Sequence, residues 1–286
     1  MLARDIELDC SNLRLAARAW GDPALPKLLA LHGWLDNAAS FDALAPLLCR
    51  HFHIVAIDFP GHGRSQWRAP GAWYHTVDYL SDALGAAGAL GWQRFGMLGH
   101  SLGAAVASMI AGACPERVER LLLIEGLGPI TGAADDAAKQ LGRALAERAN
   151  AKSKAPRVFA SLDDAISARQ RAGDLSVAAA RALVERGVKH VEDGLTWSTD
   201  PRLMLASPVR YVEEQILAVL REIRAPTGLI LAQPEQPYMP RAGMDNRIAQ
   251  VTGIEAARLA GTHHLHMEDA QLVADALLKF RAARSN

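Results

Sequence analysis

The sequence predicts an α/β fold with a mainly parallel sheet, and two observations support that prediction. Short apolar runs of strand length alternate with helix-like stretches through the first half of the chain. Strand-like runs return near the C-terminus, after a long segment with helical spacing. Because alternating strands and helices give parallel strands with helices on both faces, the pattern indicates one sheet interrupted by a helical insertion.

The first half contains five strand-like runs with helical candidates between them. The strand candidates are residues 13–20, 27–33, 53–59, 94–100 and 117–126, and the helical candidates are 41–49, 77–90 and 102–113. Strands separated by stretches of helical length are typical of crossover units, so consecutive strands should run parallel.

The middle of the chain, from about 127 to 224, is rich in Ala, Arg and Glu with helical spacing. Within it, the run 175–187 has Ser176 as a plausible N-cap and Gly187 as a C-terminal stop. Strand-like runs return at 227–233 and 254–261, and an amphipathic helix ends the chain at 269–284. We therefore expect a core domain of residues 1–126 and 225–286 and a helical insertion of residues 127–224.

The composition limits the classes of partner. Half of the 286 residues are apolar, and 31 basic side chains balance 31 acidic ones without a block of like charge. This balance suggests neither nucleic acid nor an anionic membrane as a partner, and favours a small neutral molecule. The sequence has no glycine-rich dinucleotide fingerprint, so we expect no cofactor. It leaves the oligomeric state open.

The cysteines and the N-terminal residues bear on location. Cys10, Cys49 and Cys114 are odd in number and scattered, which favours reduced thiols over a disulfide or metal site. The first residues do not read as a signal peptide, and no apolar run approaches the roughly 20 residues that span a bilayer. We expect a cytoplasmic protein.

The run 95–113, FGMLGHSLGAAVASMIAGA, contains the main candidate for chemistry. Ser101 lies between Gly99 and Gly103, where an apolar strand gives way to a helix. Glycines at these positions allow a strained strand-to-helix turn that presents the hydroxyl to a base. The start of the helix also offers unpaired N–H groups, notably that of Leu102, to a developing oxyanion.

Two further strand ends complete the pattern. The run LLALHGW ends at His32-Gly33-Trp34, a turn that can bring a second backbone N–H, that of Trp34, to the same oxyanion. The run AIDFPGHGRS ends in a glycine-proline turn, where we expect Asp58 and Arg64 to organise loops and not to react.

With these motifs the chain resembles an α/β-hydrolase over nearly its whole length. The segments HGWLDNAASFDALAPLL, YHTVDYL, LVERGVKHVEDGLTWSTDPRL and HHLHMED are more particularly similar to the serine hydrolase-like group. Position 104 departs from the common second glycine, but Ala104 is small enough to keep the turn. The resemblance implies a mostly parallel eight-stranded sheet, a cap inserted after the sixth strand, and a serine nucleophile.

The resemblance also places the catalytic base in the loop after the last strand. The run GTHHLHMED offers three histidines there. Matching Gly261-Thr262-His263 to the common glycine-x-histidine pattern of the family gives His263 as the base, with His264 as the runner-up. A metal site is a weaker interpretation, because this short loop lacks a set of carboxylate partners.

Two glutamates compete for the acid that orients the base. Glu235 lies in the loop after the seventh strand, the commoner location in the family. Glu125 ends the strand LLLIEG, a location that some relatives with a cap use. A carboxylate at the end of an apolar strand is unfavourable unless it is paired or functional, so we favour Glu125 and keep Glu235 as the alternative.

These residues predict a serine hydrolase, and we favour a carboxylic-ester hydrolase for a small or medium, largely apolar acyl substrate. Two other functions stay open. One is hydrolysis of a carbon–carbon bond, for which the cap normally supplies polar groups. The other is a hydrolase-fold receptor that binds a ligand with little turnover.

Overall fold

The apolar runs predicted as strands form one eight-stranded sheet in the computed structural model, which describes residues 3–10, 13–151, 157–235 and 240–282. The strand order is β1-β2-β4-β3-β5-β6-β10-β11. The strands are β1 (Arg4–Cys10), β2 (Leu13–Trp20), β3 (Lys27–Leu31), β4 (His53–Ile57), β5 (Phe95–His100), β6 (Val118–Ile124), β10 (Thr227–Gln233) and β11 (Glu255–Ala260). Pairs β1–β2 and β2–β4 are antiparallel and the other five are parallel, which confirms the predicted α/β-hydrolase sheet.

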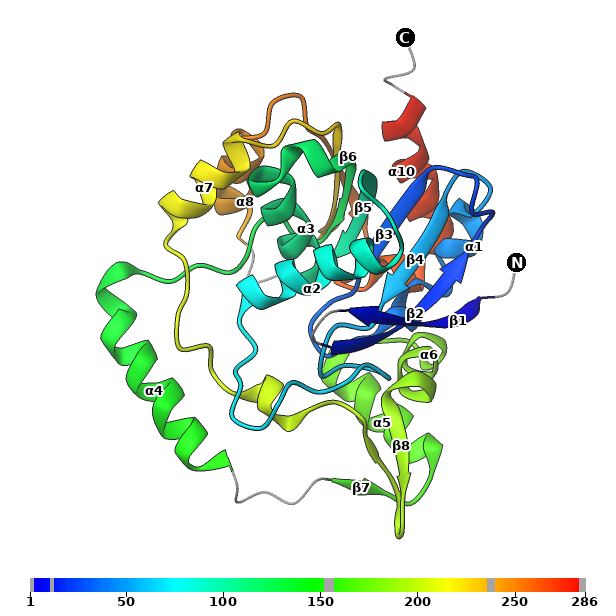
Figure 1. Cartoon of the computed structure of the whole chain (residues 1–286), viewed down its shortest axis with the longest axis vertical. Coiled ribbons are helices and arrows are strands. Elements are labelled where there is room, and N and C mark those ends of the chain that lie inside the picture. Colours follow the sequence, from blue (N-terminus) through cyan, green and yellow to red (C-terminus); the bar gives the residue numbers. More distant parts are fainter. Residues whose placement is uncertain (1–2, 11–12, 152–156, 236–239, 283–286) are drawn as a thin grey trace.

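Helices cover both faces of this sheet (Figure 1). One face packs against α2 (Thr76–Ala89), α3 (Leu102–Ala113) and α7 (Glu213–Arg221), and the other against α1 (Ala45–Leu48) and α10 (Ala270–Ala282).

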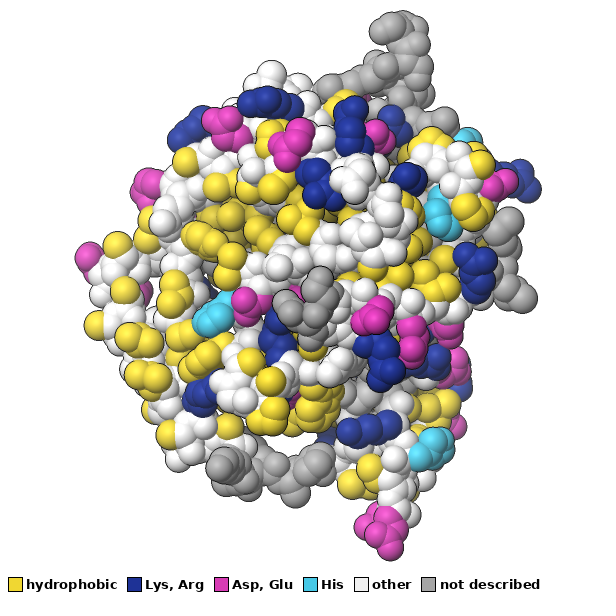
Figure 2. All heavy atoms as spheres, viewed as in Figure 1, with side chains coloured by type: hydrophobic (Ala, Val, Ile, Leu, Met, Phe, Trp, Pro, Cys, Tyr) yellow, Lys and Arg dark blue, Asp and Glu magenta, His cyan; other side chains and the backbone are white. Residues whose placement is uncertain are grey.

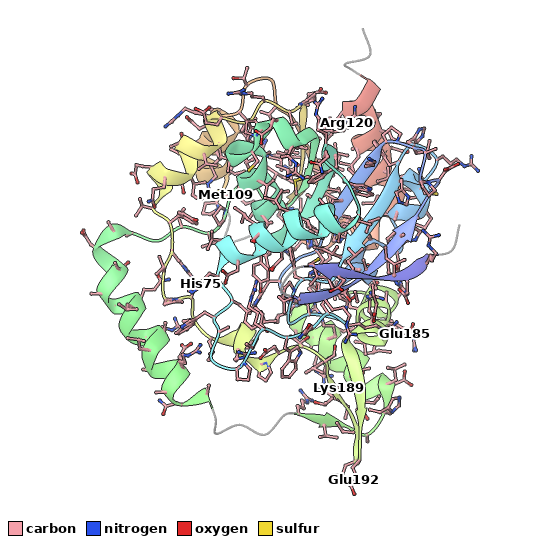
Figure 3. The ribbon with its side chains drawn as sticks, viewed as in Figure 1. His75, Met109, Arg120, Glu185, Lys189 and Glu192 are labelled. Atoms are coloured by element: carbon pink, nitrogen blue, oxygen red, sulfur yellow. The ribbon has the colours of Figure 1, made fainter. Side chains whose placement is uncertain are left out.

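The central strands are buried on both sides. In β3, Leu29 and Leu31 face the α2 and α3 side, whereas Leu28 and Ala30 face the α1 and α10 side. This is why the central strands read as continuous apolar runs rather than alternating ones. Met109 of α3, labelled in Figure 3, belongs to the same core cluster as the apolar side chains of α7.

The described residues also form three shorter helices and four 3-10 turns, of which η3 and η5 lie within the segment 127–224. They are α8 (Arg241–Ile248), α9 (Leu265–Glu268), η1 (Ala38–Phe41), η2 (Pro115–Arg117), η3 (Ala134–Asp136) and η5 (Pro201–Met204), with α1 as the third short helix. The helix predicted over 41–49 is therefore wrong in extent, because η1 and the four-residue α1 occupy that region. Pro46 lies in the first turn of α1, a position that proline tolerates.

The segment 127–224 holds helices and also a small sheet that the sequence analysis did not predict. Its helices are α4 (Ala137–Ala149), α5 (Leu162–Gly173), α6 (Val177–Gly187) and α7, and its antiparallel strands are β7 (Val158–Phe159), β8 (Val188–Val191) and β9 (Gly194–Trp197). Glu192 lies at the tip of the β8–β9 hairpin (Figure 3). The strands are too short to show a period-2 pattern, so they read as part of the helical stretch.

The predicted N-cap and the predicted end of α6 are confirmed. The Ser176 side chain accepts a hydrogen bond from the N–H of Ala179, and the helix ends at Gly187. Helices α5 and α6 share their own apolar cluster with β7, including Phe159, Ile166 and Leu183.

The end of the middle segment packs differently from its beginning. Ile216 and Leu220 of α7 join the core cluster against α3, whereas α4 buries only Ala144. On the face shown in Figure 2, charges of both signs are mixed and apolar side chains gather over α4 at the left. The domain boundaries at 126/127 and 224/225 stay a prediction.

Two simpler observations concern the cysteines and the membrane. Cys10, Cys49 and Cys114 are free thiols. Within the described ranges, no helix combines the length and apolar character needed to cross a bilayer.

Candidate active site

Ser101 occupies a tight turn between β5 and α3. Its backbone has φ 52° and ψ −112°, a conformation that residues other than glycine rarely adopt. A Cβ at Gly103 would lie 1.9 Å from the carbonyl oxygen of Leu31, and one at Gly99 would lie 2.5 Å from the nitrogen of Ala104. The two glycines are thus needed for the close approach of the helix to the sheet.

Glu125 lies beside Ser101 because β5 and β6 are paired. The register pairs His100 at the end of β5 with Ile124 at the end of β6. Ser101 is the next residue after β5, and Glu125 is the next residue after β6. The Ser101 N–H donates to the carbonyl of Ile124 at 2.9 Å, and the Glu125 N–H donates to that of Ile230 at 2.8 Å. Both residues therefore lie at the carboxyl edge of the sheet, where ligands bind in open α/β folds.

His263 meets Glu125 from the loop after β11. Its Nδ1 lies 3.0 Å from Oε2 of Glu125, and Oε1 of the same carboxylate accepts from the N–H of Ala232 at 2.5 Å. The Glu125 side chain is 3% exposed, so the contact is shielded from water. An Nδ1–H that donates to the carboxylate leaves Nε2 as an acceptor, the tautomer that a general base requires.

The surroundings of His263 keep its ring neutral. Burial lowers the pKa of His263 below its usual value, while the hydrogen bond with Glu125 opposes that effect. A neutral imidazole at pH 7 can accept a proton.

Glu235, the alternative acid, lies at the start of α8. Its exposed carboxylate accepts from the N–H of Arg241 at 2.9 Å. Both glutamates line one pocket, with Leu231, Ala232, Arg241, Met244 and Arg258. Glu125 is the carboxylate that contacts His263.

The turn after β3 carries Trp34. The N–H of Asp36 donates to the carbonyl of Gly33 at 3.1 Å and closes the turn, and Leu35 within it has φ 62°. The Trp34 indole N–H donates to the carbonyl of Leu203 at 3.2 Å. In the described chain, four residues other than glycine have a positive φ. Three of them lie after the ends of neighbouring strands: Leu35 after β3, Ser101 after β5 and Glu125 after β6.

The buried side chain of His32 contacts this turn at Gly33. Its Nδ1 lies 2.7 Å from the carbonyl oxygen of Gly33, and its Nε2 accepts from the N–H of Phe59 at 2.9 Å. These partners fix a neutral ring with the proton on Nδ1. Burial agrees, because it lowers the pKa of His32 to about 4.

Leu102 is the first residue of α3. Its N–H belongs to the first turn, where helices leave N–H groups without an intrahelical acceptor. Backbone N–H groups at such helix starts can bind anions.

The loop after β4 is held together by Asp58, as expected for that motif. Its carboxylate accepts from the N–H groups of Ala38 at 2.7 Å and Arg64 at 2.9 Å, and it pairs with the buried Arg186 of α6 at 3.0 Å.

Sequence reasoning missed the buried residues Asp36 and His100 and the half-buried Arg169, which lie beside the site. Asp36 pairs with Arg169 of α5 and lies 3.3 Å from Nε2 of His264 and 3.6 Å from Nδ1 of His100. The runner-up base His264 thus faces Asp36. The one signal available was an aspartate two residues after the HGW motif. Among the described residues, no three His, Cys, Asp or Glu side chains are grouped to hold a metal ion.

Relatives of the chain have been described in several organisms. A serine hydrolase-like protein of Dictyostelium discoideum is 31% identical over 94% of this chain and 79% of its own length. A crystal structure of a hypothetical protein from Pseudomonas aeruginosa PAO1 has 43% identity and a TM-score of 0.92, covering 97% of this chain and 99% of that one. A thioesterase domain from the curacin biosynthetic pathway has 25% identity and a TM-score of 0.84, covering 97% and 100%.

The sequence profile of the Alpha/beta hydrolase family matches residues 28–276, most of the chain. The match spans the turn of Trp34, the turn of Ser101 and the loop of His263. The chain therefore belongs to the alpha/beta hydrolase family and, within it, is similar to the serine hydrolase-like proteins.

Proposed function

We propose that this protein is a serine hydrolase that cleaves carboxylic esters, with Ser101 as nucleophile, His263 as general base and Glu125 as the acid that orients the base. The observation that carries the proposal is the 3.0 Å contact between Nδ1 of His263 and Glu125, next to Ser101 in its strained turn. A hydroxyl, an imidazole and a buried carboxylate in this order constitute a nucleophilic triad.

The reaction proceeds in two halves. His263 takes the proton of the Ser101 hydroxyl as the oxygen attacks the acyl carbon, and then gives that proton to the departing alcohol. Water next gives a proton to His263 and attacks the acyl-enzyme, and the proton returns to Ser101 as the acid leaves. Glu125 stabilises the imidazolium in both halves and stays ionised.

The N–H groups of Trp34 and Leu102 are the proposed oxyanion hole. Leu102 supplies a first-turn helix N–H next to the nucleophile. The turn of Trp34 is fixed by the Asp36 and His32 contacts with Gly33, so its N–H is already oriented before substrate arrives. Fixed donors of this kind cost little reorganisation when the charge develops.

The surface near the site supports an apolar acyl substrate. Trp34 and Met204 are both exposed, and the hydrogen bond from the Trp34 indole to Leu203 brings these two apolar side chains into the same neighbourhood. We propose that residues 127–224 act as a cap that encloses a small or medium acyl group here. The similar structure from the curacin biosynthetic pathway is a thioesterase domain, which supports acyl transfer as the chemistry.

The test is labelling with a fluorophosphonate probe, combined with turnover of p-nitrophenyl butyrate. The wild type should label and hydrolyse the ester, and Ser101→Ala should do neither. His263→Ala should slow both by about a thousandfold or more. Unchanged labelling of Ser101→Ala would refute the nucleophile, and normal labelling of the wild type without ester turnover would refute the ester assignment.

A further inference from the structure

A buried aspartate outside the proposed triad contacts residues next to the proposed nucleophile, the proposed base and the proposed oxyanion donor. The Asp36 side chain is 1% exposed, and its Oδ1 forms an ion pair with Arg169 of α5 at 2.5 Å. Its Oδ2 faces two imidazoles, with Nε2 of His264 at 3.3 Å and Nδ1 of His100 at 3.6 Å. A buried charge is costly unless it is paired, so this arrangement requires an explanation.

The contacts of Asp36 lead to three places in the site. His100 directly precedes Ser101, and His264 directly follows His263. The backbone N–H of Asp36 closes the turn that carries Trp34 through the carbonyl of Gly33. A single residue thus contacts a sequence neighbour of the proposed nucleophile, the proposed base and the proposed oxyanion donor.

His100 also joins the nucleophile turn to the base loop directly. Its Nε2 lies 2.9 Å from the backbone carbonyl of His263, and a carbonyl only accepts, so Nε2 carries the proton. With Nε2 committed to His263, Nδ1 is the atom that remains to face Asp36. The ring of His100 therefore lies between the carboxylate and the base loop, and its hydrogen bond is with the base loop.

Space around this group is restricted. A Cβ at Gly33 would come within 2.8 Å of both Oδ2 of Asp36 and Nδ1 of His100. The glycine before Trp34 therefore makes room for the carboxylate and the ring, as well as shaping a turn.

The charge state of Asp36 follows from these partners. Burial alone would raise its pKa, but the contact with Nε2 of His264 and the positive charge of Arg169 outweigh burial and hold the pKa of Asp36 well below its usual value. Asp36 is therefore ionised at neutral pH.

We propose that Asp36 is a positioning residue: its backbone N–H closes the turn of Trp34, and its carboxylate keeps the turn of Ser101 and the loop of His263 in register through His100 and His264 and ties them through Arg169 to α5 of the middle segment. This inference rests on the proposed function. Asp36 acts through its neighbours and does not itself touch the reacting atoms.

The charge of Asp36 also reaches the base. The groups that act on His263 include Glu125 from the end of β6, His100 from the end of β5, and Asp36, whose negative charge raises the pKa of His263. His266 packs on His100 with ring centroids 4.1 Å apart, and burial holds the pKa of His266 well below its usual value, so it adds no charge. Removal of the Asp36 charge should therefore lower the pKa of His263.

The experiment compares Asp36→Asn with Asp58→Asn. Both changes remove the charge of a buried aspartate that pairs with an arginine of the middle segment, but Asp58 pairs with Arg186 of α6 instead of facing His100 and His264. Active sites are counted by fluorophosphonate titration, so that kcat refers to folded enzyme only. Thermal unfolding is measured alongside.

Both variants should unfold at lower temperature, but only Asp36→Asn should lose rate per active site. We expect its kcat to fall about 10- to 100-fold with KM changed less than about threefold, because a small displacement of the catalytic groups is costly. The acid limb of its kcat/KM profile should move to lower pH by about half a unit. Equal kcat per site and equal acid limbs in Asp36→Asn and the wild type would overturn the inference, as would an equal loss in both variants.

Arg169→Gln gives a second test with the opposite sign, which decides the matter if Asp36→Asn does not fold. Removal of the cation leaves the Asp36 charge less compensated, so the acid limb should move to higher pH. An unmoved limb would count against the inference. A wild type that neither labels nor turns over ester would instead refute the proposed function, whatever the variants do.

Discussion

Ser101 and Glu125 occupy equivalent positions at the ends of two paired strands, each one residue beyond the pair His100–Ile124. Their backbones have nearly the same left-handed φ, 52° and 55°. Such strain persists only where the surrounding structure enforces it, and it concentrates at functional sites. The relationship explains how two side chains 24 positions apart in sequence come to lie at one edge of the sheet.

Glu125→Gln should reduce kcat/KM for p-nitrophenyl butyrate by about 10²- to 10⁴-fold, because an amide cannot stabilise the imidazolium and can hold the ring in the wrong tautomer. Glu235→Gln should stay within about threefold of the wild type, since its carboxylate contacts the N–H of Arg241. Steady-state kinetics on the two variants checks the assignment. The reverse pattern would make Glu235 the acid.

Ser101→Gly should stabilise the fold while abolishing activity. Glycine adopts φ 52° without strain, so the free energy of unfolding should rise by about 1 kcal/mol after the greater flexibility of the unfolded chain is subtracted. Urea unfolding followed by circular dichroism measures the change. Ser108→Gly in α3 is the control and should destabilise, because the Ser108 hydroxyl accepts from the N–H of Gly128 at 2.9 Å. A destabilised Ser101→Gly would argue against strain at this turn.

Much of the fold follows from local patterns that the sequence displays. The parallel strands are buried on both faces, so they appear as apolar runs, and α6 begins at a serine cap and ends at a glycine. Strand β1 (Arg4–Cys10) alternates charged and apolar residues from Asp5 onwards, as expected of a strand with one exposed face, but it has no continuous apolar run, which is the pattern by which the other strands were predicted. Strands β7 and β9 are only two and four residues long, below the length at which a period is visible.

The candidate site was only partly accessible from sequence. Motifs around Ser101 and His263 are local, so they can be read from a single stretch of chain. The choice between Glu125 and Glu235 depended on which strand end faces the base loop, and that is a property of the sheet order. The pairing of Asp36 with Arg169 joins residues 133 positions apart, and no local pattern announces such a contact.

Gly103→Ala should destabilise the protein by several kcal/mol, because the added Cβ would lie 1.9 Å from the Leu31 carbonyl oxygen and must push α3 away from the sheet. Gly142→Ala on α4 is the matched control. The structure has nothing within 4 Å of a Cβ there, and alanine favours a helix over glycine, so stability should rise by up to about 1 kcal/mol. Thermal unfolding of both variants measures the difference. Similar melting temperatures would show that the helix can shift at no cost.

Acid should destabilise the fold through His32, and the sign follows from its two hydrogen bonds. Burial lowers the pKa of His32 from 6.5 to about 4, so folding favours the neutral ring. The resulting stability is complete above pH 6.5 and is lost progressively as the pH falls to about 4, where the ring takes up a proton and Phe59 loses its acceptor. The loss attributable to this group is on the order of 2–3 kcal/mol.

Urea unfolding of the wild type and His32→Gln at pH 7, 6, 5 and 4 tests this origin. His32→Gln should be less stable than the wild type at pH 7, because its side chain fits the two partners less well, but it should lose less stability on acidification. The free energies of the two proteins should therefore converge towards pH 4. His190→Gln, at an exposed position of β8, controls for the change of residue type and should follow the wild-type curve. Parallel curves for wild type and His32→Gln would assign the acid sensitivity to other buried groups, of which His62 and His266 are the first to test, since burial lowers the pKa of both.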